Sequence, residues 1–379
     1  MTEMSVERRE LREAVRRCLE RGEGPRPYLV GEPGTSEPYD GKLWHLLGAE
    51  VGVAGLIVPE EHGGAGARLA DLAVVAEELG RFLAPVPFLS TVALATPALL
   101  LSDGDALAGE LLARIAGGNA TATLACCDGD GSWDVETAAV SAVPAGGGWR
   151  LSGSASFAVD AVGTDILLVP ARTGAGLGLF AVERDAPGLR CQASTTLDLT
   201  RPLGTVTLEA APGRPIGPDS GAEAVLRPAL DVALALLAAE QVGGAQRCLD
   251  EAVAYAKQRI QFDRPIGSFQ AIKHTLVDML LKVEMARSAA SIAVAAADEY
   301  LAAPGEENAR RLAAAASLAK SVCSEAFMYA AEESLHVHGG IGFTWEHDCH
   351  LYYRRAKASE LFLGDPGWHR ERLAVCAGL

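Results

Sequence analysis

The sequence predicts an α+β multidomain fold, in which a helical N-terminal region, a central antiparallel β region and a C-terminal helical bundle follow one another. Two observations support this prediction. The spacing of apolar residues changes from helical to strand-like and back to helical along the chain. The 379 residues, 49% of them hydrophobic, are also too many for a single stack of layers. We expect the domains to span residues 1–118, 119–217 and 218–379.

The N-terminal region has the apolar spacing of helices as far as Gly118. Its clearest segment is LADLAVVAEELGRFL, residues 69–83, where apolar side chains recur every three or four positions. The segment PEEHGGAGA, residues 59–67, interrupts this pattern, because its glycines permit tight backbone turns. We therefore expect a helical domain that is broken by one turn-rich segment.

The central region, residues 121–217, consists of short runs rich in β-forming or alternating residues, separated by Gly, Pro and Asp. The runs are WRLSGSASFAV, DILLVPAR, GLGLFAVER and GTVTLEA. Because no helical stretch lies between them, we expect an antiparallel sandwich or barrel and not a parallel Rossmann sheet.

The helical spacing returns from about Ala222 onward. In residues 269–286, seven apolar residues form one stripe that is typical of a bundle helix: Phe269, Ile272, Leu276, Met279, Leu280, Val283 and Ala286. Pro304 and Gly305 then separate this helix from a second, Ala-rich helix over about residues 306–337. This arrangement predicts a bundle of long helices.

Composition narrows the classes of protein to consider. The formal net charge of −16 argues against a nucleic-acid partner, since phosphate backbones bind clustered Lys and Arg. No stretch offers the ~18 uncharged apolar residues of a membrane span, and the N-terminus lacks the apolar core of a signal peptide. The eight cysteines are scattered without CxxC spacing, as in proteins that keep their thiols reduced. We expect a cytoplasmic protein.

The segment AKQRIQFDRPIGSFQAIKH, residues 256–274, holds more polar detail than helix packing requires. Pro265 ends one long helix and Ser268 can cap the next. Around this corner Arg259, Phe262 and Gln270 offer a cation, an aromatic face and an amide. A planar guanidinium can bind two phosphate oxygens at once, so this corner suits a pyrophosphate.

A second segment, LHVHGGIGFTWEHDCHLYYRRAK, spans residues 335–357. Its glycines at 339, 340 and 342 interrupt the helix and let the backbone approach a ligand closely. We interpret this turn as a cradle for part of a nucleotide. The segment also holds residues of metal-binding type: His336, His338, His347, Cys349 and His350.

These two segments resemble the C-terminal signature regions of the acyl-CoA dehydrogenase family, R-x-Q-F-G-x-P-I-x-x-F-Q and h-G-G-x-G-F followed by R-x-A-K. The resemblance continues in PEEHGGAGARLADLAVVAEELGR of the N-terminal region and GWRLSGSASFAVDAVGTDILLVPAR of the β region. It therefore covers nearly the whole chain, and four ordered motifs are far more specific than one glycine pattern.

The resemblance implies a C-terminal four-helix bundle, a tetrameric assembly and non-covalently bound FAD. By similarity, the residues at the bundle corner contact the FAD of a neighbouring subunit, and those of the glycine turn lie along its nucleotide portion: Arg259, Phe262 and Gln270, then His336, Gly339 and Gly340. Since the family resemblance accounts for the histidine-rich segment as flavin-binding turn and helix, we expect no metal there.

In the β region the resemblance assigns two further sets of flavin contacts. Cys127 and Asp128 occupy the positions of the family's Thr-Glu pair, and Phe157, Ala158 and Val159 those of its Trp-Ile-Thr or Trp-Ile-Ser. These residues depart from the family pattern, because valine has no hydroxyl to donate and a thiol is a weak donor.

The residue that would remove the substrate's α-proton also departs from the pattern. This task suits a carboxylate in a dry pocket, while the flavin accepts the hydride. Counting forward from Arg354, Ala356 and Lys357 places Leu363 on the family's catalytic Glu. Some relatives carry the base on the first long bundle helix, and that register falls near Ala233 or Leu234. Neither position has a carboxylate.

Three interpretations follow. Glu240, two helical turns beyond Ala233, could serve as the base instead. Alternatively, the chain pairs with a homologous subunit that carries the base, as in the α2β2 heterotetrameric branch used on bulky steroid side chains. The third interpretation is another flavin reaction on the same scaffold, such as oxygen activation.

The function we expect is FAD-dependent α,β-dehydrogenation of an acyl thioester, borne by CoA or a carrier protein. The resemblance implies a homo- or heterotetramer that passes electrons to an acceptor such as an electron-transfer flavoprotein. A hypothesis of a different class is a non-catalytic partner subunit that completes a homologue's FAD site through Arg259 and the turn at residues 339–342.

Overall fold

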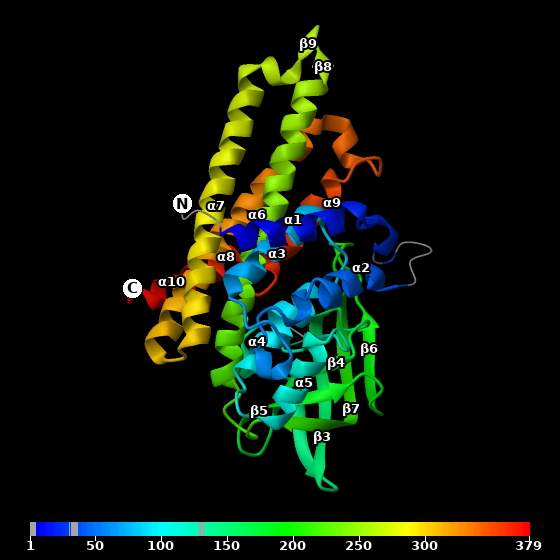
Figure 1. The fold of residues 1–379 in the computed structure, drawn as a ribbon, viewed down its shortest axis with the longest axis vertical. Helices are drawn as coiled ribbons and strands as arrows, with labels where there is room; N and C mark the ends of the chain where they lie inside the picture. Colours follow the sequence, from blue (N-terminus) through cyan, green and yellow to red (C-terminus); the bar gives the residue numbers. More distant parts are fainter. Residues whose placement is uncertain (1–4, 30, 32–36, 129–130, 132) are drawn as a thin grey trace.

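The fold has the three parts that the sequence predicts (Figure 1). The structure is a computed structural model that describes residues 5–29, 31, 37–128, 131 and 133–379. Helices give way to strands after Ala116, and strands give way to helices after Ile216. The predicted fold class is confirmed, whereas the domain boundaries at residues 118 and 217 stay predictions.

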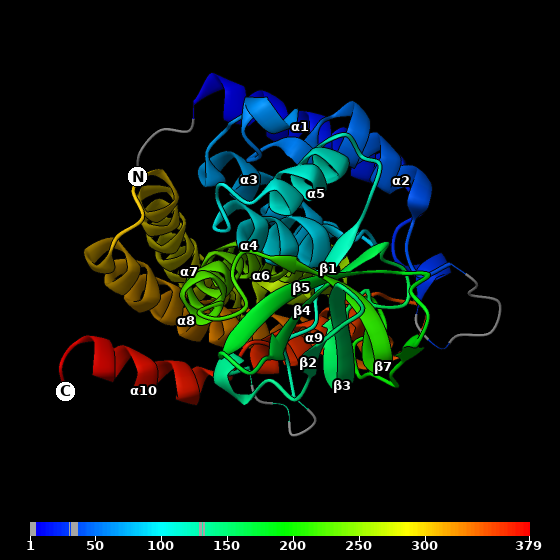
Figure 2. The ribbon, with the colours of Figure 1, turned by 90° about the horizontal axis from the view of Figure 1, so that it is seen from below.

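The N-terminal part consists of helices that lie across the bundle (Figures 1 and 2). They are α1 (Val6–Arg21), α2 (Gly41–His45), α3 (Leu69–Phe82), α4 (Thr96–Leu100) and α5 (Ala106–Ala116). The predicted helix over residues 69–83 is α3. Side-chain oxygens cap three of these helices, since Ser5 accepts from the Arg8 N–H, Asp40 from the Leu43 N–H and Asp105 from the Ala108 N–H.

The β part is a sheet whose pairings close into a ring. Its strands are β1 (Ala122–Leu124), β2 (Ser141–Ala145), β3 (Gly148–Val159), β4 (Ile166–Arg172), β5 (Leu177–Glu183), β6 (Leu189–Ala193) and β7 (Leu203–Ile216). Antiparallel pairs join β2–β3, β3–β7, β7–β5 and β5–β4, and a single pairing of β2 with β4 closes the ring. Side chains such as Leu151, Phe180 and Val206 form its core.

Two pairings differ from the antiparallel prediction. β1 runs parallel to β4, with Ala122 opposite Ile166, and β2 meets β4 in parallel as well. A parallel pair requires a long connection between its strands, and here β2 and β3 lie between β1 and β4 in the chain. Composition alone could not show this, because the strands are short and apolar in either orientation.

The C-terminal part is built on long helices. They are α6 (Glu223–Gln258), α7 (Gln270–Ala302), α8 (Glu306–His338), α9 (Cys349–Leu361) and α10 (Pro366–Cys376). A small hairpin, β8 (Ile260–Gln261) with β9 (Arg264–Pro265), joins α6 to α7 at the end of the bundle farthest from the β part (Figure 1). Over the described part of the chain, no helix combines the length and hydropathy needed to cross a membrane.

The stripe predicted along α7 is buried only in part. Met279, Val283 and Ala286 are buried, but Leu280 is 44% exposed. Val277 and Leu281 on the same helix are more than half exposed. Helix α7 therefore carries a second apolar face that the described residues leave exposed.

Helices α3 and α6 cross at very short range because glycines lie at the contact. A Cβ atom on Gly243 would lie 1.8 Å from the Glu77 carbonyl oxygen, and one on Gly80 would lie 2.0 Å from the Glu240 carbonyl oxygen. Only glycine fits at both positions. The crossing fixes the N-terminal helices against the bundle, and it brings α3 against the part of α6 that holds Glu240.

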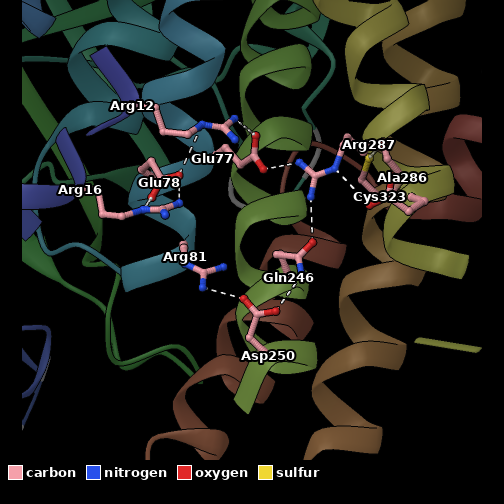
Figure 3. Close-up of polar contacts among 11 residues, drawn as sticks. Arg12, Arg16, Glu77, Glu78, Arg81, Gln246, Asp250, Ala286, Arg287 and Cys323 are labelled. Carbon is pink, nitrogen blue, oxygen red and sulfur yellow. Dashed lines mark hydrogen bonds and ion pairs between the residues drawn. The ribbon is translucent and has the colours of Figure 1, made fainter. Parts of the chain in front are cut away.

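Ion pairs extend this contact to both sides (Figure 3). Glu77 of α3 accepts from Arg12 of α1 at 2.7 Å and also pairs with Arg287 of α7. Glu78 accepts two hydrogen bonds from Arg16, at 2.7 and 2.9 Å. The network therefore ties α1, α3 and α7 together around the helix crossing.

We expect Gly243→Ala to lower the free energy of unfolding by about 1–3 kcal/mol, because the added methyl group forces α3 and α6 apart. Chemical denaturation measures this change. Gly174→Ala is the matched control, since a Cβ there meets no atom within 4 Å, and we expect it to change stability by less than about 0.5 kcal/mol. Equal stability of the two variants would show that the crossing tolerates the extra volume.

Candidate functional site

Leu363, which the sequence analysis predicts to occupy the position of the family's catalytic Glu, lies in the turn between α9 and α10. Leu363 adopts a left-handed backbone conformation, φ 59°, which is uncommon for a residue other than glycine, and Gly364 follows with φ 96°. The Leu363 side chain is only 3% exposed and belongs to the main hydrophobic core together with Phe362. Trp133 packs edge-on against Phe362, with ring centroids 4.7 Å apart. An apolar side chain therefore fills this position completely.

Two buried basic residues hold the turn in place. The Lys320 ammonium of α8 donates to the carbonyl oxygens of Glu360 and Gly364, both at 2.9 Å, and Nε2 of His369 lies 2.8 Å from the Leu363 carbonyl oxygen. Burial lowers the pKa of Lys320 to about 7 and the pKa of His369 to about 4. His369 is therefore neutral at pH 7 and donates from Nε2. The turn therefore keeps a fixed shape with an apolar side chain at position 363.

Glu240 lies at the centre of a buried cluster of charges. It pairs with Arg201, which lies just before β7, and accepts from Arg355 of α9 at 2.9 Å. Arg355 also pairs with Asp198 at 2.7 Å and donates to the Thr200 hydroxyl. All of these residues are less than 9% exposed. The cluster joins the β part to the bundle.

The pKa of Glu240 reflects these contacts. Burial alone would raise it, but the Arg201 and Arg355 guanidiniums outweigh burial and hold the pKa of Glu240 below its ordinary value. A general base at neutral pH instead needs a pKa raised toward 7. The assignment of Glu240 as the base stays an untested prediction, and the contacts seen here are those of a structural ion pair.

A small cavity of about 20 Å³ borders this cluster. It is lined by Glu240, Arg201 and Arg355 and also by Val159 and Asp160 of the β part. The structure thus brings together Glu240 and Val159, two predicted site residues. The volume suffices for about one water molecule and not for an acyl chain.

Asp160 is a buried carboxyl group that the sequence analysis did not identify. Burial raises the pKa of Asp160 to about 6, although the Ser90 hydroxyl donates to it at 2.6 Å. The residue also has a left-handed backbone, φ 55°. A carboxyl group with a pKa near neutrality is the type that can exchange protons at physiological pH.

The flavin contacts predicted in the β part lie on adjacent strand segments. Cys127 pairs with Ser156, whose N–H donates to the Cys127 carbonyl oxygen at 2.9 Å, and Asp128 follows directly. Burial raises the pKa of the Cys127 thiol to about 12. Phe157 is 41% exposed with φ 54°, whereas Ala158 and Val159 are buried. No hydroxyl therefore stands at the Val159 position.

The other predicted cofactor residues lie at the opposite end of the bundle, on the hairpin side. Arg259, Phe262 and Gln270 are exposed around the β8–β9 hairpin, and Phe262 is 84% exposed. Gly339 and Gly340 begin the 3₁₀ turn Gly339–Phe343 after α8, where an added Cβ on either glycine would meet no atom within 4 Å. His336, in the last turn of α8, is exposed beside Glu333.

These two groups fit FAD to different degrees. The hairpin end offers an accessible guanidinium, an exposed aromatic ring and open glycine backbone, which suit a pyrophosphate and an adjoining ring held from outside this chain. At the positions where the resemblance implies hydrogen bonds to the flavin, the β part offers a thiol, which is a weak donor, and a valine, which has none. The hairpin end therefore fits part of the cofactor, and the β part is a poor fit.

Comparison with known proteins agrees with this fold. Residues 5–119 match the model of the acyl-CoA dehydrogenase N-terminal domain, and residues 219–376 match the model of its C-terminal domain. The chain is 37% identical to acyl-CoA dehydrogenase IpdE2 of Mycolicibacterium smegmatis over 98% of both chains.

Two solved structures with similar sequences are assemblies of paired chains. The Tcur3481-Tcur3483 steroid acyl-CoA dehydrogenase, solved as a variant, has a TM-score of 0.84 and 33% identity, covering 98% of both chains. The ChsE4-ChsE5 complex from Mycobacterium tuberculosis has a TM-score of 0.84 and 27% identity, covering 99% of this chain and 98% of the other.

This chain belongs to the acyl-CoA dehydrogenase family, a family of oxidoreductases that bind FAD. The resemblance that the sequence indicated is thereby confirmed.

Glu240→Gln tests the buried cluster. We expect it to lower the free energy of unfolding by about 3–5 kcal/mol at pH 7, because Arg201 and Arg355 stay buried without their shared counter-charge. Glu209→Gln, in an exposed pair with Arg190, should cost at most about 1 kcal/mol.

We expect the stability difference between the Glu240→Gln variant and wild type to depend on pH. Since the pKa of Glu240 is lowered in the folded state, its contribution is present above the unfolded pKa of about 4.3 and is lost as the pH falls through the folded value. Denaturation at a series of pH values should show the difference between the Glu240→Gln variant and wild type shrinking only below about pH 4. A constant difference would contradict the lowered pKa.

Proposed function

We propose that this chain is one subunit of a heteromeric acyl-CoA dehydrogenase. In this proposal it contributes the hairpin end to an FAD whose flavin lies in a homologous partner subunit, and the partner supplies the carboxylate that removes the α-proton. The assembly then carries out α,β-dehydrogenation of an acyl thioester. When bound, FAD accepts the β-hydrogen as hydride and passes the electrons to an external acceptor.

The observation that carries the proposal is the turn at Leu363. An isobutyl group cannot accept a proton, and it is buried in a turn held by Lys320 and His369. Moving the turn to bring another side chain into this position would break these hydrogen bonds, which are buried and costly to lose. These contacts support a subunit in which position 363 does not supply the base.

The separation of the two predicted cofactor regions supports a shared site. Glu240, beside Val159 in the small cavity, and Arg259 lie on one unbroken helix and its C-cap. Nineteen residues at 1.5 Å per residue put them about 28 Å apart. Arg259 and Phe262 are also exposed to solvent. Arg259 and Phe262 are therefore better placed to contact a cofactor bound by a neighbouring subunit than one bound beside Glu240 of the same chain.

The exposed apolar face of α7 supports a partner at this surface. Its exposed apolar residues are Val277, Leu280, Leu281, Met285 and Ile292. Val277 and Leu280 also line a groove of about 610 Å³ between α6 and α7. Contiguous exposed apolar surface of this kind marks protein interfaces. We infer that a homologous subunit covers this face.

The similar proteins support both the pairing and the substrate class. One is described as a steroid acyl-CoA dehydrogenase of two chains, and another is a complex of two chains. By analogy, the acyl group is one attached to a steroid, which is bulky and largely apolar. A self-sufficient enzyme with Glu240 as its base is less well supported, because two guanidiniums already occupy that carboxylate.

The proposal is tested by purifying the chain alone and together with a homologous subunit that carries Glu at the position of Leu363. We expect only the pair to hold flavin that acyl-CoA bleaches under anaerobic conditions. Arg259→Ala should weaken FAD binding by the pair about 10- to 100-fold, because a charged hydrogen bond to phosphate is lost. Arg9→Ala, an exposed arginine on α1, should leave it unchanged.

Two results would contradict the proposal. One is a lone chain that binds flavin and is bleached by an acyl-CoA. The other is a lone Leu363→Glu chain that becomes active, because it would show that this chain holds a complete flavin pocket and lacks only the base.

The partner surface is tested with Leu281→Asp. A charge at the centre of a buried apolar contact should weaken association of the pair by about 2 kcal/mol or more, as measured by analytical ultracentrifugation. Val6→Asp is the control, since Val6 is similarly exposed, at 55%, but lies on α1. If both variants assemble like wild type, the α7 face is not the interface.

A further inference from the structure

Three residues with metal-binding side chains meet where α8 ends and α9 begins. His338 is the last residue of α8, Cys349 is the first of α9, and His347 lies in the connection between them. Each offers one ligand atom, and these atoms all lie within 4.8 Å of one another. His338 and Cys349 are buried. The sequence analysis expected no metal in this segment because the family resemblance already explained it, and sequence could not show this packing.

The orientation of His338 leaves one ring nitrogen free to act as a ligand. Its Nδ1 lies 2.7 Å from the Ser334 carbonyl oxygen, and a carbonyl can only accept, so Nδ1 carries the proton. Nε2 therefore has a free lone pair. A backbone carbonyl that fixes the tautomer in this way is the usual outer contact of a metal-bound histidine.

The other two residues can adapt to a cation at small cost. Cys349 Sγ lies 3.4 Å from the protonated Nδ1 of His338, so the thiol is beside the imidazole but has to shift along the ring edge to share a cation with Nε2. His347 accepts the Cys349 N–H at 3.2 Å, a long hydrogen bond that cation binding would replace. The two imidazole rings lie 4.4 Å apart between centroids.

There is also room for a further ligand. A cavity of about 220 Å³ is lined by His347, Cys349 and the carboxylate residues Glu251, Glu346 and Asp348. Two arginines, Arg26 and Arg247, line it as well, and they pair with Asp348 and Glu251. A water molecule could therefore complete the coordination of an ion bound by three protein ligands.

We propose that His338, His347 and Cys349 form a binding site for a borderline divalent cation such as Zn²⁺. Imidazole nitrogen and thiolate sulfur select Zn²⁺ over Mg²⁺ or Ca²⁺, which prefer oxygen. As the sulfur–metal bond forms, the Cys349 thiol releases its proton to solvent, and no oxidant or reductant is needed. The bound ion would tie the start of α9 to the end of α8 and hold the turn Gly339–Phe343 between them.

Cobalt(II) is the probe for this site, because a thiolate–Co²⁺ bond gives a charge-transfer absorption in the near ultraviolet. The full chain is freed of metal with a chelator and titrated with Co²⁺ alone. We expect this band to saturate at one Co²⁺ per chain and to disappear when Zn²⁺ is added. Cys349→Ser should abolish the band, and His347→Ala should weaken binding at least about tenfold.

Control variants separate this site from other thiols and imidazoles. Cys376→Ser and His45→Ala, both on exposed residues outside the cluster, should bind Co²⁺ like wild type. Circular dichroism establishes that each variant is folded. If Cys349→Ser does not fold, the wild-type titration and the weaker Co²⁺ binding expected for His347→Ala still test the proposal. The proposal is overturned if wild type shows no thiolate–Co²⁺ band, or if the band persists in folded Cys349→Ser.

Discussion

The buried charge cluster around Glu240 is the constraint on which the relation between the β part and the bundle depends. Two guanidiniums from different segments share one carboxylate, and Arg355 reaches a second one, Asp198. Moving a charge out of water costs several kcal/mol, so a buried charge is stable only when it is paired with an opposite charge. The cluster therefore fixes where β7 begins relative to α6 and α9, and with it the position of Val159 beside the small cavity.

The turn at Leu363 is fixed by contacts that do not depend on the side chain at position 363. Lys320 and His369 hold the backbone carbonyl oxygens of this left-handed turn, and the side chain of Leu363 takes no part in these hydrogen bonds. The structure keeps the turn because α8, α9 and α10 pack around it. An apolar side chain at this position is therefore compatible with the packing of the surrounding helices.

The sequence predicted most of the fold but less of the site. The periodicity of residues 69–83 and 306–337 located α3 and α8 well, because long amphipathic segments leave a strong pattern. The parallel pairing of β1 and the exposure of Leu280 were missed, since both depend on neighbours remote in sequence. Arg201 and Arg355 were missed for the same reason. An isolated arginine in the sequence gives no sign that folding will bury it.

The attachment of α1 to α3 depends more on ionic strength than the packing of the bundle does. This helix buries only Val15 and Leu19. Much of its attachment to α3 comes from three arginines spaced one turn apart: Arg8 pairs with Asp71, and Arg12 and Arg16 pair with Glu77 and Glu78 (Figure 3). Ions screen partly exposed pairs far more than they weaken an apolar core. Ionic strength thus acts on the N-terminal helix first, so that in strong salt the molecule would loosen at this edge while its bundle stayed intact.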